Sequence, residues 1–265
     1  MNPRVLDTLA PVGLEELNDS AALLTRTDRK YLLVPGRHDQ LTTQLHDQVL
    51  AVAGARSLQI AGTRDFGYRS TYFDTAEHTG FTGAAHRRRR RFKVRLRHYV
   101  DTGECHLEVK TRGMRGSTVK ERLELPAGTD RLGAAAREHV AERLAESRIE
   151  GVDVNDLRPV LTTHYRRRTV LLPGSGARLT LDSALAWELP DGRRQPAPEL
   201  LVLETKTPVG SRAAVDRFLW AHGCRPARFS KYATGRALLD PDLPRNRWHR
   251  VITRDLDPHT HQEDR

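Results

Sequence analysis

A strict alternation of basic and apolar residues constrains the fold of this chain more than any other feature. In the stretch FKVRLRH, which begins at Phe92, the basic residues Lys93, Arg95 and Arg97 occupy every second position. A period of two is typical of a β-strand with one face against a core. The other face of this strand is then cationic, which suits an anion. The block Arg87–Arg91 before it has no period and fits either a solvated loop or a basic rim beside the anion site.

Similar short segments follow one another from 66 to 125 and from 159 to 207, after a first strand predicted over 25–34. Consecutive strands joined by tight turns indicate an antiparallel sheet that closes, or nearly closes, into a barrel. Helical periodicity marks 14–24, 38–52, 130–147 and 213–222. The predicted fold class is therefore α+β: an eight-stranded antiparallel β tunnel with helices packed outside.

The chain is predicted to have three parts. An N-terminal helical segment (1–24) is expected to pack on the tunnel, the tunnel domain is predicted over 25–240, and the polar stretch 241–265 is expected to be a weakly ordered tail. The two cysteines, Cys105 and Cys224, form no CxxC pair, so neither a zinc ribbon nor a disulfide framework is indicated. We recognise no signal peptide and no long apolar stretch, and we expect a cytoplasmic protein.

The charge of the chain indicates an anionic partner. Lys and Arg number 44 against 34 Asp and Glu, and the net charge is +10. The basic residues recur with the same alternation on successive predicted strands, ending with Lys231 in RFSKY. In a closed tunnel they would crowd inside with a few carboxylates, and such cations repel unless an anion neutralises them. The interior is therefore predicted to bind a polyanion with several phosphates, together with a hard divalent metal on the carboxylates.

Several other sites are disfavoured. The cations alternate along strands, and we find no helix-turn-helix, zinc finger or aromatic stacking platform, so we predict no nucleic-acid partner. No G-K-[ST] sequence occurs, which excludes a Walker A loop, and no histidine has metal-ligand spacing such as HExxH. Asp74 is expected to cap a turn or strand end, and Tyr72, Tyr165 and Tyr232 are expected to pack.

Nine motifs resemble, in order, those of the triphosphate tunnel metalloenzymes (the CYTH-like superfamily). More closely, they resemble the bacterial form of the VTC domain, the polyphosphate polymerase domain of the vacuolar transporter chaperone complex. The resemblance covers about 25–236, nearly the whole globular part, and implies the same eight-stranded tunnel. The motifs are RTDRKYLL (26–33), STYFDT (70–75), FKVRLRHY (92–99), LEVKTR (107–112), VKER (119–122), HYRR (164–167), RLTLD (178–182), LETK (203–206) and RFSKYATG (228–235).

The resemblance also implies roles for individual residues. Lys231, Arg95 and Arg97 are expected to be catalytic, and Glu204, with Glu108, to hold Mn²⁺ or Mg²⁺. Asp28 stands where the superfamily often carries glutamate, which has a longer side chain. The expected phosphate-binding residues are Lys30, Arg95, Arg97, Lys110, Lys120, Arg167, Arg178, Lys206, Arg228, Ser230 and Lys231.

The implied activity is phosphoryl transfer on ATP and inorganic polyphosphate or triphosphate. The first hypothesis is polyphosphate synthesis from ATP. A tunnel triphosphatase, with Glu108 or Asp28 as the base that activates water, is the alternative enzyme, and a non-catalytic polyphosphate-binding module is the third hypothesis. Because eukaryotic polymerases of the family sit in a membrane complex, a separately encoded membrane partner is compatible with the resemblance.

Overall fold

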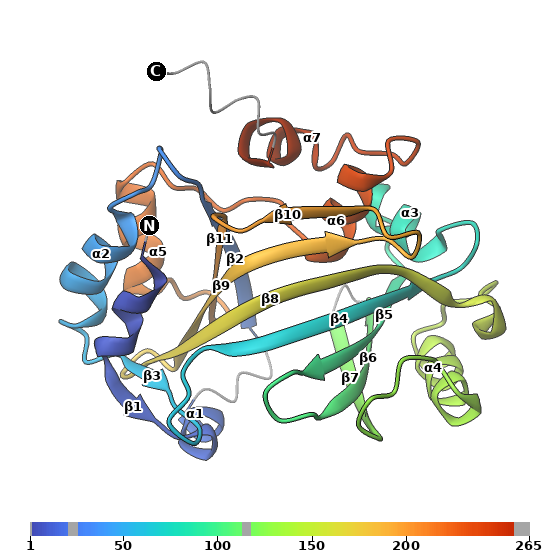
Figure 1. Ribbon diagram of the computed structural model, residues 1–265, viewed down its shortest axis with the longest axis horizontal. Coiled ribbons are helices and arrows are strands. Elements are labelled where there is room, and N and C mark those ends of the chain that lie inside the picture. The colour runs from blue at the N-terminus through green and yellow to red at the C-terminus, as the bar shows by residue number, and fades with distance from the viewer. Residues whose placement is uncertain (1, 21–25, 113–117, 257–265) are drawn as a thin grey trace.

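Eight antiparallel strands form one strongly curled sheet in the computed structural model, which describes residues 2–20, 26–112 and 118–256 (Figure 1). The strands are β2 (Arg26–Leu33), β4 (Phe66–Asp74), β5 (Arg91–Tyr99), β6 (Cys105–Arg112), β7 (Thr118–Leu125), β8 (Arg158–Leu172), β9 (Ala177–Glu188) and β11 (Leu201–Pro208). Their order across the sheet is β2-β11-β9-β8-β4-β5-β6-β7. The predicted α+β tunnel fold is confirmed.

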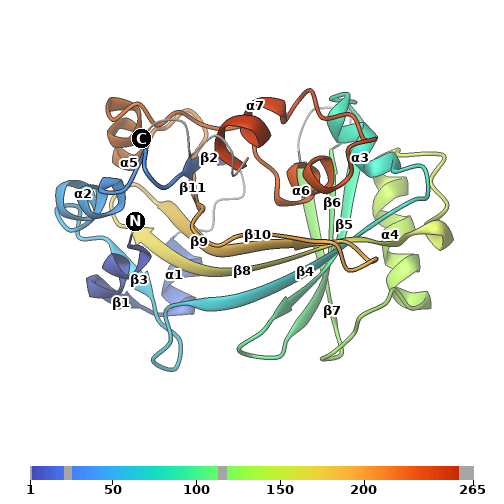
Figure 2. The ribbon, with the colours of Figure 1, turned by 45° about the horizontal axis from the view of Figure 1, so that its top comes forward.

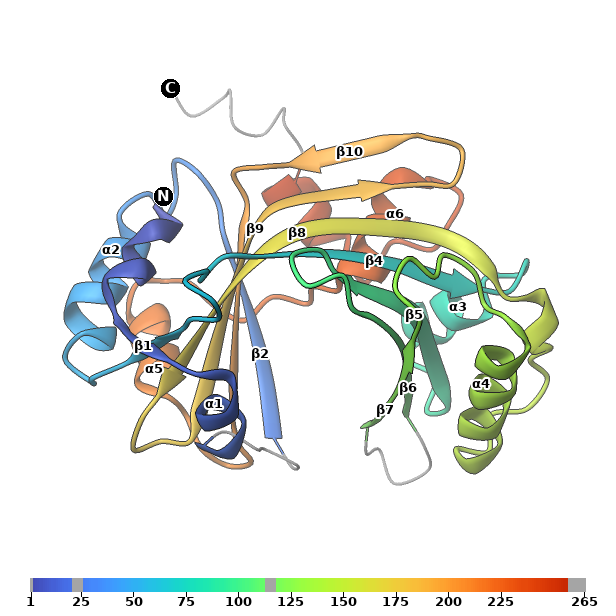
Figure 3. The same ribbon diagram turned by 60° about the horizontal axis from the view of Figure 1, so that its bottom comes forward.

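The sheet is an arch rather than a closed barrel. Figure 3 shows its two legs, with β2 on one side and β6 and β7 on the other. Within the described part of the chain, β2 and β7 do not pair with each other. Three short strands that the sequence analysis did not predict extend the sheet outside this path, because segments of three or four residues are too short to show a period of two. They are β1 (Ala10–Val12), β3 (Arg56–Leu58) and β10 (Arg194–Ala197).

Each leg of the arch has its own helices on the convex face. Tyr31 and Leu33 of β2 pack with α2 (Leu41–Leu45), the π-helical turn η2 (His46–Leu50) and α5 (Ala214–Ala221). The other leg packs against α4 (Ala134–Glu146). Three of the predicted helices are therefore present, with somewhat shorter bounds.

The remaining elements are short. They are η1 (Pro3–Thr8), α1 (Leu14–Ser20), α3 (Thr79–Ala85), η3 (Val154–Asp156), α6 (Lys231–Leu239), α7 (His249–Val251) and η4 (Ile252–Leu256). The predicted helix 14–24 is present as α1, and residues 21–24 lie outside the described residues. No helix in the described ranges is long and apolar enough to cross a membrane.

Helix α6 packs on the concave face at one end of the arch. The prediction of a strand at RFSKY is wrong. Ser230 is the N-cap of α6, and its Oγ accepts a hydrogen bond from the Ala233 amide at 3.3 Å. Tyr232 stacks on Tyr72 with 4.9 Å between ring centroids. Gly235 lies against Trp187, where a Cβ would come within 2.1 Å of the indole. This packing fixes the N-terminus of α6 at the interior of the arch.

Residues 241–256 do not form the weakly ordered tail that the sequence analysis expected. Trp248, Val251 and Ile252 are buried in the cluster that contains α6, and the Trp248 ring lies 5.5 Å from that of Phe81. Figure 2 shows α7 beside α6. These three residues, with Leu243 and Leu256 packed against the same cluster, dock the segment despite its polar composition. The rest of the predicted tail, 257–265, lies outside the described residues.

Candidate functional site

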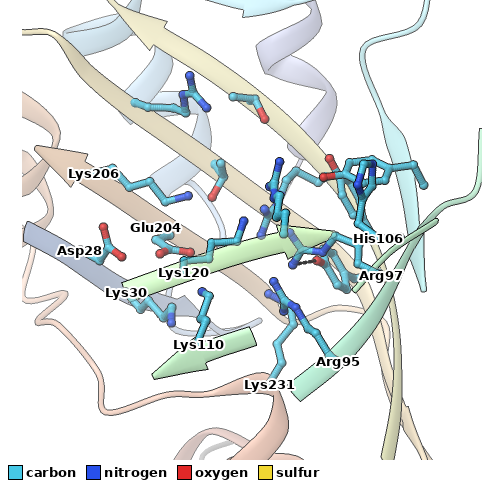
Figure 4. Close-up of a pocket in the computed structure, with 18 of the residues that line it drawn as sticks. Asp28, Lys30, Arg95, Arg97, His106, Lys110, Lys120, Glu204, Lys206 and Lys231 are labelled. Atoms are coloured by element: carbon cyan, nitrogen blue, oxygen red, sulfur yellow. Dashed lines mark hydrogen bonds between the residues drawn. The ribbon is translucent and has the colours of Figure 1, made fainter. Parts of the chain in front are cut away.

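The concave face of the arch encloses a cavity of about 560 Å³, here called the tunnel. Figure 4 shows side chains from both legs pointing into it. Among the described residues, three carboxylates line it: Asp28, Glu104 and Glu204. They face twelve cationic side chains, so the tunnel carries a large positive excess. The cations are Arg26, Lys30, Lys93, Arg95, Arg97, Lys110, Lys120, Arg122, Arg167, Arg178, Lys206 and Lys231.

One wall of the tunnel, formed by β5, β6 and β7, carries a row of three lysines. Lys93 is directly opposite Lys110, and Lys110 is directly opposite Lys120. Like charges in directly opposite positions destabilise a sheet. Burial and then neighbouring cations lower the pKa of Lys110 well below its ordinary value. Burial likewise lowers the pKa of Lys93 and of Lys120 to about 7. The row therefore has an uncompensated positive charge that would suit a ligand with several negative charges.

The next row on the same wall is organised by Glu108, which is fully buried. Its carboxylate accepts from Arg95 Nε at 2.8 Å, Arg97 at 3.3 Å and Arg122 Nε at 3.1 Å, and it pairs with Lys120 at 2.8 Å. Burial alone would raise the pKa of Glu108, but these cations outweigh it and hold the pKa far below its usual range. Both carboxylate oxygens are engaged, so Glu108 is a counter-ion that holds the cations in place.

Two tyrosines orient the same arginines. The Tyr72 hydroxyl accepts from Arg95 at 3.0 Å, and the Tyr165 hydroxyl accepts from Arg97 at 3.3 Å. The sequence analysis expected these tyrosines only to pack. Both do so, but their hydroxyl groups also point into the tunnel wall. Tyr165 has the same parity as Arg167 on β8, and this was the signal that could have identified it. Tyr72 had no such signal, because it faces Arg95 only through the pairing of β4 with β5.

The opposite wall, formed by β2 and β11, has a different charge pattern. Glu204 is directly opposite Lys30, and Lys206 is directly opposite Asp28. Burial alone would raise the pKa of Glu204, but surrounding cations, with Lys30 and Lys206 foremost, hold it well below its usual value. Glu204 is therefore an ionised carboxylate that faces the tunnel. Asp28 lies diagonally across the strand pair on the same face, within the range at which diagonal neighbours interact.

Lys231 comes from the N-terminus of α6, where the helix dipole is positive. Its amine pairs with the buried carboxylate of Asp182. Arg167 holds the same carboxylate through two hydrogen bonds of 2.6 and 2.8 Å. Burial alone would raise the pKa of Asp182, but the two cations lower it to about 2. Asp182 was not predicted as a site residue, although it follows Arg178 and Thr180 at the inward parity.

The remaining predicted residues divide between the tunnel and its surroundings. Arg178 lines the tunnel at the end covered by α1, where it donates to the Leu17 carbonyl at 2.9 Å. Ser230 also lines it and accepts from Lys93 at 3.1 Å. Arg228 does not line the tunnel, because the chain turns at Ser230 and leaves Arg228 in the loop before α6. The structure thus brings the predicted phosphate-binding residues together except for Arg228, and their role stays a prediction.

Asp74 is a cap, as expected. Its carboxylate accepts from the amides of Gly80 and Phe81 at the start of α3, at 2.8 and 2.9 Å, and from the Tyr232 hydroxyl. No group of three or more His, Cys, Asp or Glu side chains that could hold a metal ion occurs within residues 2–20, 26–112 and 118–256.

A sequence model of the VTC domain matches residues 25–240. The chain belongs to the VTC domain family. Among solved structures, this VTC domain is similar to HpAC1 from Hippeastrum, a putative adenylyl cyclase described as having a dominant triphosphatase activity. The identity is 17%, the match covers 80% of this chain and 96% of that chain, and the TM-score is 0.50. A putative adenylate cyclase from Bacillus halodurans is similar at 14% identity over 78% of this chain and 94% of that chain, with a TM-score of 0.49. No curated protein matches the chain. The resemblance found in the motifs is confirmed for the family and the fold.

Proposed function

We propose that this VTC domain is a metal-dependent phosphotransferase that makes polyphosphate from ATP in the tunnel. One observation carries the proposal: the Lys93–Lys110–Lys120 row lies in the same cavity as the ionised Glu204. The row suits the negative charge of several linked phosphates. A carboxylate opposite it suits a divalent metal, which would neutralise part of the phosphate charge.

The proposed role of the protein side chains is to position the phosphates and neutralise their charge. Phosphoryl transfer needs little covalent participation from the protein, so preorganised cations supply much of the catalysis. Arg95 and Arg97 are fixed by Glu108 and the two tyrosines before any ligand binds, and their forked guanidinium groups match phosphate oxygens. Lys231, held by Asp182, provides a compact charge from the end of α6.

The residues present fit a hard divalent cation. Mg²⁺ and Mn²⁺ are commonly held by one or two carboxylates together with substrate phosphates and water. Glu204 and Asp28 would supply these carboxylates, and the metal would neutralise charge on the phosphates. We do not assign Glu108 to the metal, because its oxygens already accept from four cations.

A tunnel triphosphatase is the second candidate. The similarity to the Hippeastrum protein, described as a triphosphatase, favours it through the fold. Hydrolysis gains from a base that activates water. Glu108 is poorly suited to this role because cations hold its pKa far below its usual range, which leaves Asp28 as the candidate base. Membership of the VTC family supports synthesis as the first choice.

The test is incubation of the purified protein with ATP and Mn²⁺ or Mg²⁺, with separate detection of polyphosphate and free phosphate. Long chains with ADP are the expected products. Free phosphate without chains would show the triphosphatase instead, and neither product would reject both enzymes.

Glu204→Gln is the variant to compare. It should lower turnover by about a hundredfold or more, because it removes charge stabilisation worth several kcal/mol at the transferred group. Glu188→Gln, at the half-exposed end of β9 and outside the tunnel lining, is the matched control and should retain wild-type turnover. Binding of inorganic triphosphate without metal should survive in both variants. Wild-type turnover by Glu204→Gln would reject the metal assignment.

A further inference from the structure

A second basic hollow lies outside the tunnel. It is bounded by the end of β2, the loop from α5 to α6 and the C-terminal helical segment, which consists of α7 and η4 with the residues just before them. Its volume is about 620 Å³. The arginines that line it come from three separate parts of the sequence, so no single basic run produces the hollow. They are Arg37, Arg225, Arg228, Arg247, Arg250 and Arg254.

Two of these arginines, Arg37 and Arg254, already form ion pairs with one carboxylate, that of Asp255. Asp255 is buried and accepts from Arg37 at 2.9 Å and from Arg254 through two bonds of 2.7 Å. Among the described residues, no Asp or Glu lines the hollow itself. Burial and nearby arginines, including Arg228, lower the pKa of Arg247. The hollow therefore has a positive excess of the kind found in the tunnel.

A third hollow, of about 410 Å³, joins the two. It shares Lys30, Lys93 and Lys110 with the tunnel. It shares Arg228 and Arg247 with the second hollow. Cationic side chains thus continue from the lysine row, past the start of α6, to the C-terminal helical segment. The position of Arg228, which does not line the tunnel, is explained if it belongs to this path.

We propose that a polyphosphate chain longer than the tunnel leaves it beside Lys93 and Ser230, passes Arg228 and Arg247, and is held in the second hollow by Arg225 and Arg250. This inference rests on the proposed function, since it takes the polyanion of the tunnel as its ligand. A linear chain with about one negative charge per phosphate matches a path lined mainly by cations, with Asp28 as the one carboxylate among the described residues that line the connecting hollow. Holding the chain outside the tunnel would keep it bound while its end lies among the catalytic residues.

The test compares the binding of inorganic tripolyphosphate with that of long-chain polyphosphate. Arg225→Ala/Arg250→Ala changes two exposed residues of the second hollow. Arg131→Ala/Arg217→Ala removes the same charge from exposed positions that line none of the hollows described above, and is the matched control. Thermal unfolding confirms that both variants fold.

The hollow variant should bind long-chain polyphosphate about tenfold more weakly than the control, with a smaller dependence on salt concentration, because fewer phosphates are neutralised. Its affinity for tripolyphosphate, which fits within the tunnel, should match that of the control. Equal affinities of both variants for the long chain would overturn the path. A parallel loss of tripolyphosphate affinity would overturn it too, because the arginines would then act on the tunnel itself.

A third variant, Arg228→Ala, tests the junction and should show the same selective loss for long chains. If the wild-type protein binds neither ligand, the proposed function itself fails, and the path fails with it. If tripolyphosphate binds normally and only the chain-length effect is missing, the path alone is rejected.

Discussion

The two walls of the tunnel differ in how their carboxylates are placed relative to their cationic side chains. On the β5–β7 wall, one buried carboxylate, Glu108, is shared among four cations. In the adjacent row the three lysines are directly opposite one another, and only Lys120 at its end reaches Glu108. On the β2–β11 wall, positive and negative residues are directly opposite, as in Glu204 with Lys30 and Lys206 with Asp28. The first wall therefore has an excess of positive charge, and the second carries Glu204, the carboxylate proposed to bind a metal.

This difference separates structural from functional carboxylates. Both glutamates are buried, and nearby cations lower the pKa of each. Hydrogen bonds engage both oxygens of Glu108, whereas Glu204 is surrounded by cations and lines the open cavity. The electrostatic environment alone would not separate the two roles, but the hydrogen-bond geometry does.

The largest expected effect is that of Glu108→Gln on stability. Removing the central charge leaves Arg95, Arg97, Lys120 and Arg122 to repel one another, and breaking a buried ion pair costs about 3–5 kcal/mol. Urea denaturation at low salt measures the change in the free energy of unfolding. Glu104→Gln, just before β6, is the control, since its half-exposed carboxylate pairs with His106 at 3.4 Å and with no other cation among the described residues. If both variants were equally stable, Glu108 would not organise the wall.

A smaller effect is expected for Lys110→Met, at the centre of the lysine row. The affinity for triphosphate should fall about tenfold, because one charge-assisted contact is lost. The stability without ligand should rise, because two like-charge pairs are removed. Lys206→Met on the other wall should also weaken binding. It removes a charge that is directly opposite both Asp28 and Arg178, one of opposite sign and one of like sign, so stability should not rise. Calorimetry and thermal unfolding measure the two quantities, and a change of stability in the same direction in both variants would contradict the proposed difference between the walls.

The sequence predicted the β5–β7 wall best, because the period of two is clearest there. Lys93, Arg95 and Arg97 sit on one parity of a single strand, and strand pairing puts them on the same face as Lys110 and Lys120. Periodicity does not show which cation a carboxylate contacts, so Glu108 was grouped with Glu204 as a metal ligand. RFSKY has the alternation of a strand, but a serine cap and the packing of Gly235 on Trp187 make it the start of a helix. These contacts join distant parts of the chain, and no local pattern contains them.

The smallest effect is a pH dependence that only the lysine row should produce. Burial, then Lys30 and Arg95, lower the pKa of Lys93 in the folded protein to about 7. A bound polyanion stabilises the charged amine and raises this pKa, so the complex holds more protons than the free protein above pH 7. Affinity should therefore fall as the pH rises, by about fivefold between pH 7 and pH 8 for this one lysine.

The sign is opposite for the stability of the free protein. The unfolded chain keeps the Lys93 amine charged up to its ordinary pKa, so the unfolded state binds more protons between pH 7 and that value, and stability rises with pH there. Lys93→Arg is the decisive comparison, because a guanidinium stays charged throughout this range. Titration calorimetry measures the affinity of both proteins for triphosphate at each pH. The ionisation of the ligand affects both affinities equally, so it cancels in the comparison. The affinity of Lys93→Arg should lack the fall of about fivefold between pH 7 and pH 8 that is expected from Lys93. Identical pH profiles would mean that Lys93 is already fully charged in the free tunnel, and the two walls would then differ less than their geometry indicates.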